Sequence, residues 1–569
     1  MEKKRERLQS NNVLKENLLL EISRKSTKRL SRNAETNQSG ITLIALVVTI
    51  VVLLILAGVS LNLVLGNNGI INKAKEAVDK YGEAAENEQK ELNNLIDWLE
   101  GSLGEVDDNT PGDITDGGSQ DGSFEKPYKI RSIEDFLELL TISRREGVYD
   151  KYIELETNLD FKNPNSYNDA TDTERFGDYN EDGETKGIME ELTDENGTGL
   201  KNGFEFDGIL KGKGHTISNI YIKESLVYNS TDAIDYLSGI FQENTGTIND
   251  FNVQGKMLVS IEDQTTAARI GGIVAQNKHD GKLINCTSDM EITVTANNLL
   301  QESSTAIYVG GIAGENEEGT GSTTIDGCTF KGNINSNLTI NENTAGSKYH
   351  DIKIGGIAGK NEEIITNSIN EANIDTTKNY YTTVGGVDSI MYTAGIAGEN
   401  NDKGIIENCI NLGNINSTSE TSELYVGGIV GASEDVNTCI IKNVYNSGKI
   451  SAKTTNDVSI GGVLAEGNGV IDAAYNIGTI STESNAEIKM GAIIGKYNSN
   501  ASITNCFYNK TEGLYGAEGQ DVANIVATEN LSQTQVVQEL NAKVEENNLS
   551  SSRRWYKLVE TGETITFEK

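Results

Sequence analysis

The sequence predicts a mainly β protein: a parallel β-solenoid of about eight repeats, preceded by an N-terminal transmembrane and stalk α-helix. Segments of the form aliphatic-Gly-Gly-Ile-Ala/Val-Gly-x-Asn recur at intervals of 30 to 45 residues, and a recurrence of this length is typical of solenoids. The runs between them are short, β-branched and bounded by Gly, Asn and Asp, as strands are. Only 3 of 569 residues are Pro, which leaves the strands uninterrupted. Each repeat is expected to form one coil, stacked about 4.8 Å above the last.

The N-terminal part begins with a basic leader, residues 1–40, that contains ten Lys or Arg and five Asp or Glu. An uncharged run follows at 41–65. A helix of about 25 residues rises about 1.5 Å per residue and can cross a hydrocarbon layer of about 30 Å. The basic leader favours the cytoplasm and sends the rest of the chain outside. We therefore expect a single-pass membrane protein with an extracellular C-terminal ectodomain.

The junction between leader and helix has two interpretations. One is a plain signal anchor that keeps its leader; a cleaved secretory signal would have a shorter apolar core and a small-residue cleavage site. The other rests on Ser39-Gly40-Ile41-Thr42-Leu43, which resembles the prepilin processing site of type IV pilins. The resemblance implies cleavage between Gly40 and Ile41 by a prepilin peptidase. Most pilins have Glu where this chain has Ala45, which favours a minor or tip subunit over the bulk fibre subunit.

Two segments connect the membrane run to the repeats. The stalk, which completes a helical region at 41–100, has apolar residues at alternating three- and four-residue steps from Ile71 to Leu99. This stripe predicts packing either against a partner helix, including other pilin-like subunits, or against its own ectodomain. Residues 101–123 are acidic and rich in Gly and Asp, which is typical of a flexible linker.

The ectodomain divides into an entry and N-terminal cap region at 124–236, repeats at 237–510 and a C-terminal cap region at 511–569. Ser132 and Asp135 predict the start of a capping helix over 133–141, and Ser532 precedes an amphipathic run at 533–546; caps are expected because an open solenoid end is an aggregation template. The Gly pair allows a tight turn and close approach of the next coil. Asn residues stacked on Asn are expected to form a ladder.

The repeat motif resembles the GLUG repeat of bacterial surface and adhesin-like proteins. The copies begin as LSGIFQEN at 237–244 and IGGIVAQN at 270–277 and end with MGAIIGKY at 490–497, and the entry segment GSFEKPYKIRSIEDFLELL at 122–140 also fits. GLUG repeats occur beside the catalytic part of immunoglobulin-A-specific metallopeptidases as well. The zinc motif of those peptidases is absent here, so the resemblance implies no peptidase activity.

Charge and cysteine usage restrict the partners and the compartment. The net charge of −37 argues against nucleic acid, and against an anionic lipid surface beyond the anchor. Corresponding repeat positions hold Cys286, Cys328, Cys409 and Cys506, or Phe251, Ser368, Val444 and Ala474. A position that accepts such different residues is a core slot, not a metal ligand. We expect buried free thiols, with Cys439 off register, as suits a Gram-positive bacterium from a low-oxygen habitat.

One acidic stretch is a candidate calcium site. Asp178, Asn180, Asp182 and Glu184 follow the opening of an EF-hand loop with Gly183 at its sixth position, but Met189 stands where the loop needs its last Glu. The alternative is a solvated acidic insertion before the first coil. No other cofactor is expected.

Catalytic motifs are absent from the sequence. It has three histidines and no HExxH, GxSxG, P-loop or Cys/His arrangement, and its Asp and Glu residues are interpreted as lying mostly in turns. We therefore expect no enzyme but a cell-surface adhesion protein, a minor or tip pilin-like subunit whose solenoid binds a glycan or protein ligand. A membrane-anchored structural envelope protein outside any pilus is the alternative, and a carbohydrate-active solenoid enzyme comes third. The sequence does not identify ligand-binding residues.

Overall fold

The structure is a computed structural model that describes residues 114–115, 119–145, 147–161, 205–226, 235–261, 267–300, 305–319, 322–342, 350–382, 390–433, 439–497, 501–518, 522–529, 531–550, 554–561 and 564–568. All of these belong to the second of two units, Asp108–Lys569. The Gly40–Ile41 junction, the membrane run, the stalk, most of the linker and the calcium candidates Asp178, Asn180, Asp182 and Glu184 lie outside the described residues. Among the described helices, none is both long enough and apolar enough to cross a membrane.

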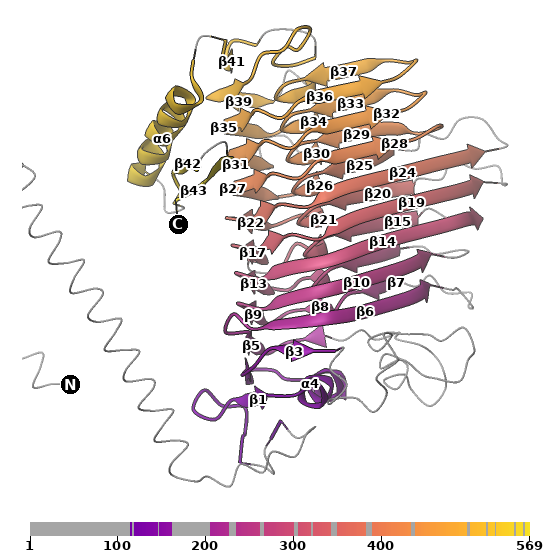
Figure 1. Cartoon of the computed structure of the whole chain (residues 1–569), viewed down its shortest axis with the longest axis vertical. Coiled ribbons are helices and arrows are strands. Elements are labelled where there is room, and N and C mark those ends of the chain that lie inside the picture. The colour runs from indigo at the N-terminus through magenta and orange to yellow at the C-terminus, as the bar shows by residue number, and fades with distance from the viewer. Residues whose placement is uncertain are drawn as a thin grey trace, which may run out of the picture. The chain divides into compact units, whose positions relative to one another are not determined.

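The described residues are mainly β, and nearly all strands belong to three long parallel sheets that stack coil upon coil (Figure 1). The first sheet, sheet A, has 24 strands: β1 (Tyr128–Ile130), β2 (Tyr152–Leu155), β3 (Leu159–Asp160), β5 (Ile209–Lys211), β6 (Thr216–Leu226), β9 (Thr247–Asn249), β10 (Asn252–Ile261), β13 (Lys282–Ile284), β14 (Thr287–Leu300), β17 (Thr324–Asp326), β18 (Thr329–Phe330), β19 (Asn333–Glu342), β22 (Ile364–Thr366), β23 (Ile369–Asn370), β24 (Asn373–Thr382), β27 (Ile405–Asn411), β28 (Ile415–Thr418), β31 (Ile440–Asn446), β32 (Ile450–Lys453), β35 (Val470–Asn476), β36 (Ile480–Glu483), β39 (Ser502–Thr504), β40 (Cys506–Tyr508) and β41 (Ile525–Ala527).

The other two parallel sheets lie on either side of the Gly-Gly turns. Sheet D has 8 described strands: β7 (Asp235–Ser238), β11 (Ala267–Gly271), β15 (Thr305–Gly310), β20 (His350–Gly355), β25 (Ile390–Ala394), β29 (Glu423–Gly427), β33 (Val458–Gly461) and β37 (Ile488–Gly491). Sheet C has 9: β4 (Glu205–Phe206), β8 (Phe241–Asn244), β12 (Val274–Asn277), β16 (Ala313–Asn316), β21 (Ala358–Asn361), β26 (Ala397–Asn400), β30 (Val430–Ser433), β34 (Leu464–Gly467) and β38 (Ile494–Tyr497). This arrangement confirms the expected parallel solenoid.

One coil passes through all three sheets. It begins with a short strand such as β9, bends at one residue, continues as a long strand such as β10, returns through β11 in sheet D and turns at Gly271-Gly272 into β12. The bend residue has a left-handed backbone in coil after coil: φ is 51° at Asp250, 53° at Asn285 and 54° at both Asn367 and Asn408. Asn and Asp tolerate this conformation better than other side chains, which explains their recurrence there.

The second glycine of the Gly-Gly pair is required by the stacking distance. A Cβ on Gly356 would lie 2.2 Å from the carbonyl oxygen of Gly395 in the next coil and 2.5 Å from Cγ of Asn370. Both distances are far below a van der Waals contact, so no larger residue fits without moving a coil. This confirms the close backbone approach expected from the motif.

Asparagine ladders connect the coils, as predicted. In the first, the side-chain amides of Asn244, Asn277, Asn316 and Asn361 each donate to the side-chain oxygen of the next Asn, and the series ends at Asn400; the four bonds measure 2.7 to 2.8 Å. A second ladder runs through Asn370, Asn411, Asn446 and Asn476, with all three bonds at 2.7 Å. Each of these Asn residues is 0 to 1% exposed. The ladders therefore satisfy buried amides that would otherwise destabilise the stack.

The core slot predicted from the cysteines is confirmed. Cys409 pairs with Val444, and Val444 with Ala474, in register across neighbouring coils. All five cysteines are buried and free. Burial raises the pKa of the Cys409 thiol to about 12, so this thiol stays protonated and unreactive in the folded chain.

The N-terminal end of the stack is covered by helix α4 (Ile133–Arg145). Its first turn is fixed by reciprocal bonds: the Ser132 amide donates to the Asp135 carboxylate and the Asp135 amide to the Ser132 hydroxyl, both at 3.1 Å. Phe136 packs its ring 6.5 Å from the rings of Phe241 and Phe251. The capping helix is thus confirmed, and it extends four residues beyond the expected end at 141.

The region predicted as a C-terminal cap has two parts. Over the last coil, β41 pairs with β40, and Ala517 bridges Ile494 of β38. Helix α6 (Gln533–Ser550) and the antiparallel hairpin of β42 (Leu558–Thr561) and β43 (Thr564–Phe567) pack instead on the flank of β27, β31 and β35 (Figure 1). The reason is the apolar surface that those strands present, Ile410, Tyr445 and Tyr475. We call residues 531–568 the C-terminal module.

Candidate functional site

The candidate site is a polar seam, formed by side chains of sheets D and C that meet beside the Gly-Gly turns. The side chains of the seam form two columns that run along the stack, one from each sheet. The column on sheet D consists of the residue just before the aliphatic residue that opens each motif. The column on sheet C consists of the variable residue just before the Asn of the first ladder. In register, the first column contains Arg269, Tyr308, Lys353, Tyr392 and Tyr425, and the second Glu243, Gln276, Glu315, Lys360 and Glu399.

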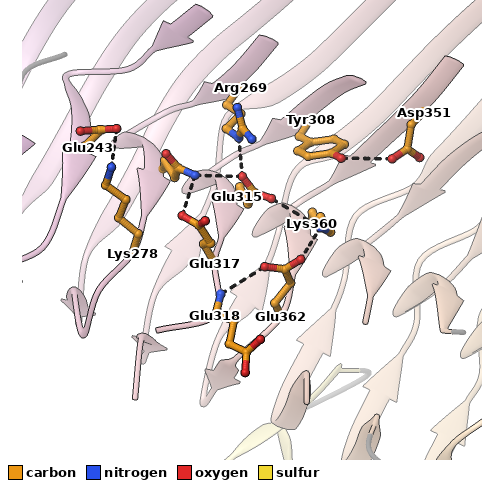
Figure 2. A network of polar contacts seen from close by, with 11 residues as sticks. Glu243, Arg269, Lys278, Tyr308, Glu315, Glu317, Glu318, Asp351, Lys360 and Glu362 are labelled. Atoms are coloured by element: carbon orange, nitrogen blue, oxygen red, sulfur yellow. Dashed lines mark hydrogen bonds and ion pairs between the residues drawn. The ribbon is translucent and has the colours of Figure 1, made fainter. Parts of the chain in front are cut away.

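The N-terminal half of the seam contains several groups of polar contacts (Figure 2). Lys278 forms an ion pair with Glu243 at 2.6 Å. Arg269 forms an ion pair with Glu315, and the Gln276 amide donates to Glu315 at 3.1 Å and to Glu317 at 2.8 Å. These contacts therefore join side chains from each of three successive coils to a neighbouring coil.

The next coil continues the network. Lys360 forms an ion pair with Glu362 and lies 3.6 Å from Glu315. The backbone amide of Glu318 donates to Glu362 at 3.1 Å. Each carboxylate of this group thus has a cation or an N–H donor beside it.

Tyr308 lies where three cations converge. Its ring centroid is 5.1 Å from Nζ of Lys353 and 5.8 Å from both Nζ of Lys360 and Cζ of Arg269. Its hydroxyl donates to Asp351 at 3.1 Å. Lys353 in turn forms ion pairs with Asp351 at 2.7 Å and with Glu399 at 2.6 Å. Cation–π attraction and ion pairing therefore act on the same ammonium group.

Several charged residues of the seam are buried. Glu315 and Glu399 are each 3% exposed and Lys353 is 5% exposed. Burial raises the pKa of Glu399 to about 6, against the opposing effect of Lys353. Burial also raises the pKa of Glu317, and the neighbouring Glu315 adds to the rise. Burial opposes the charged form of Lys360, yet Glu362 and Glu315 hold its pKa above the ordinary value.

These contacts indicate what the seam does chemically. Its carboxylates are committed to ammonium, guanidinium and amide donors of neighbouring coils, so it connects successive coils by charge-assisted bonds. Some hydroxyl groups also lie beside carboxylates: Tyr308 donates to Asp351 at 3.1 Å, and Ser459 donates to Glu466 at 3.4 Å. Among the described residues, no group of three or more His, Cys, Asp and Glu could hold a metal ion.

The seam was not predicted from the sequence. Asp and Glu residues were expected to lie mostly in turns, whereas Glu243, Glu315 and Glu399 lie on strands of sheet C. A signal was present: the variable motif position holds Glu, Gln or Lys in every repeat except that of Ala432. The predicted residues Gly40 and Ile41 and the calcium candidates lie outside the described part of the chain.

Comparison with known proteins gives little further information. No family model matches the chain, and no curated protein does. A crystal structure described as that of a putative immunoglobulin A1 protease from Bacteroides ovatus is similar at 15% identity, with a TM-score of 0.29, over 79% of this chain and 94% of that one.

Proposed function

We propose that the chain is a cell-surface display and adhesion protein with a non-catalytic GLUG-type solenoid, mounted on the membrane through residues 41–65 after pilin-type processing at Gly40–Ile41. It acts as a minor or tip pilin-like subunit and presents its solenoid to a glycan or protein ligand.

The polar connections between successive coils support a role as a mechanically stable display scaffold. The first ladder links coils from Asn244 to Asn400 and the second from Asn370 to Asn476, so together they link the repeats from 244 to 476. The seam adds buried ion pairs such as Lys353–Glu399. A stack linked in this way resists shear between coils, which is what a displayed, extended binding surface needs.

The pairing of the carboxylates in the seam supports a non-catalytic role. A general acid or base must be able to exchange its proton with a substrate. In the seam, Glu315 is held by Arg269 and Gln276, and Glu399 by Lys353. These carboxylates therefore hold neighbouring coils together.

The decisive experiment is N-terminal sequencing of the mature protein from native membranes, together with protease shaving of intact cells. We expect Ile41 as the first residue and loss of the ectodomain on shaving. A Gly40→Asp variant should keep residues 1–40 and remain anchored. Sheared fibres that lack the protein would favour the envelope-protein alternative, ectodomain protected inside intact cells would contradict the proposal, and sugar products released by the purified protein would show a carbohydrate-active enzyme.

A further inference from the structure

We propose that the N-terminal edge of the solenoid binds a glycan through an aromatic–lysine patch formed by Phe124, Tyr128, Tyr149, Tyr152, Lys151 and Lys211. This inference deepens the proposed adhesive function and rests on it. It assigns a ligand class and a binding surface. That surface lies away from the polar seam.

The patch contains the two most exposed aromatic side chains of the described residues. Phe124 is 64% exposed and Tyr149 is 73% exposed, against 39% for Tyr515 and 37% for Tyr556. Neither Phe124 nor Tyr149 contributes to the buried core clusters. Grouped exposed rings cost solubility and are typical of interaction sites, whereas single exposed apolar residues need no explanation.

Within the patch, Phe124, Tyr152 and Lys211 contact one another, as do Tyr128 and Lys151, and Tyr149 belongs to the same turn as Lys151. The rings of Phe124 and Tyr152 meet edge to face, with centroids 5.4 Å apart and planes at 79°. Nζ of Lys211 lies 5.2 Å from the Phe124 centroid and 5.6 Å from that of Tyr152. Nζ of Lys151 lies 5.8 Å from the Tyr128 centroid. Ring faces and hydrogen-bond donors are thus presented side by side.

The loop that carries Phe124 is held in place. The Gly122 amide donates to the Lys126 carbonyl at 3.0 Å, and the Ser123 amide to the Asp121 carboxylate at 2.9 Å. The ammonium group of Lys151 donates to the Asp121 carbonyl at 2.6 Å and ties the loop to the turn before β2. Such preorganisation lowers the entropic cost of binding.

Tyr149 is presented by a tight turn. The Lys151 amide donates to the Val148 carbonyl at 2.9 Å, and Asp150 has a left-handed backbone with φ 57°. The Val148 amide donates to the Asp207 carboxylate at 2.6 Å and fixes the start of this turn. The second exposed ring is therefore also held by backbone geometry and not by a long mobile segment.

A glycan fits this patch better than a membrane or a nucleic acid. A pyranose ring offers C–H groups that stack on an aromatic face and hydroxyl groups that accept from ammonium donors, which is the combination present here. A chain with net charge −37 is repelled by anionic lipid surfaces and by nucleic acid. Neutral glycans carry no such penalty, and they also tolerate the Glu154 carboxylate that lies 3.6 Å from Nζ of Lys211.

The test is binding of the full-length protein in detergent to a printed array of neutral, uronate-containing and sialylated glycans. We expect binding to at least one of these classes, and a loss of about tenfold or more in affinity on Phe124→Ala or Tyr149→Ala, as for other aromatic anchors. Tyr556→Ala is the matched control, because it removes an exposed ring far along the chain, and it should bind as the wild type does. Phe124→Tyr keeps an aromatic ring at this position and should bind as the wild type does.

Three outcomes would overturn the inference: no glycan bound by the wild type, glycan binding that is unchanged in both patch variants, or binding only to vesicles of phosphatidylcholine with phosphatidylglycerol. Unchanged melting of Phe124→Ala and Tyr149→Ala would show that they fold, as the exposure of both side chains predicts. The N-terminal sequence of the same preparation tests pilin-type processing separately from glycan binding by the patch. Glycan binding by a protein that does not begin at Ile41 would contradict pilin-type processing and leave the patch intact.

Discussion

Lys353 on β20 and Glu399 on β26 form an ion pair of 2.6 Å between neighbouring coils, with side chains only 6% and 4% exposed. Removal of one partner leaves the other charge buried. We therefore expect Lys353→Met to lower the free energy of unfolding by about 3–5 kcal/mol at pH 8. Lys453→Met is the control, because the Lys453–Glu483 pair is exposed and should contribute at most about 1 kcal/mol.

The cost of Lys353→Met should depend on pH. The folded-state pKa of Glu399 is raised by burial to about 6, from 4.5, so Glu399 ionises more easily in the unfolded chain. Its contribution to stability is present below about 4.5 and is lost as the pH rises through 6. Once Glu399 is protonated it no longer needs a cation, and denaturant titrations of the variant should show a smaller loss at pH 5 than at pH 8. An equal loss at both pH values would contradict this assignment.

Lys378 should destabilise the solenoid that contains it. The side chain is fully buried on β24, its ammonium group donates to the Ile390 carbonyl at 3.1 Å, and burial lowers its pKa to about 7 from 10.5. Lys378→Met should raise the free energy of unfolding by roughly 2–4 kcal/mol at pH 7, since the relief of about 1.4 kcal/mol per pKa unit is offset in part by the freed carbonyl.

The pH dependence provides the check. Between pH 7 and 10.5 the unfolded chain binds more protons at Lys378 than the folded chain does, so the stability of the wild type should rise with pH in that window. The variant should lose this slope, whereas Lys403→Met, at an exposed lysine, should keep it. Equal slopes in wild type and Lys378→Met would show that the folded-state pKa is not lowered.

Asn316 occupies the middle of the first ladder. It accepts from Asn277 and donates to Asn361, both at 2.8 Å, and is fully buried. Asn316→Ala leaves a donor and an acceptor without partners, so we expect a loss of about 2–4 kcal/mol in chemical denaturation. Asn337→Ala, at an exposed position of β19, should change stability by less than about 0.5 kcal/mol. Similar losses in the two variants would argue that the ladder does not stabilise the stack.

The solenoid could be predicted from the sequence because its requirements recur at the same position of each repeat. Gly356 is needed by the close carbonyl of Gly395 and Asn316 by its ladder neighbours, so the motif records both. The seam could not be predicted in the same way. Arg269 meets Glu315 across 46 residues, and that pairing depends on the register between coils of unequal length.

The placement of other side chains was equally hidden from the sequence. Lys378 stacks on Leu338 in register, and only the stacking of β24 on β19 shows that this lysine faces the core. The flank position of α6 depends on Tyr445 and Tyr475, which belong to strands about 60 to 100 residues earlier in the chain. Patterns within one repeat predict the coil, and contacts between coils decide the site.

The C-terminal module should be able to unfold while the solenoid stays folded. Trp555 is 5% exposed in the cluster with Tyr445 and Tyr475, and on the same flank the side-chain amides of Asn408 and Asn443 donate to the carbonyls of Arg554 and Tyr556 at 3.1 and 2.9 Å. Trp555→Ala removes a large buried side chain, for which a loss of about 3–5 kcal/mol is usual.

We expect amide hydrogen exchange to accelerate in α6 and in the β42–β43 hairpin of Trp555→Ala, while β27, β31 and β35 keep their protection. The reason is that the backbone bonds of these three strands run to neighbouring coils and not to the module. Leu549→Ala is the control on the same helix, because Leu549 is 91% exposed and its removal should leave exchange unchanged. Faster exchange in the three strands as well would show that the module is part of the cooperative unit of the solenoid and not a separate element docked on its flank.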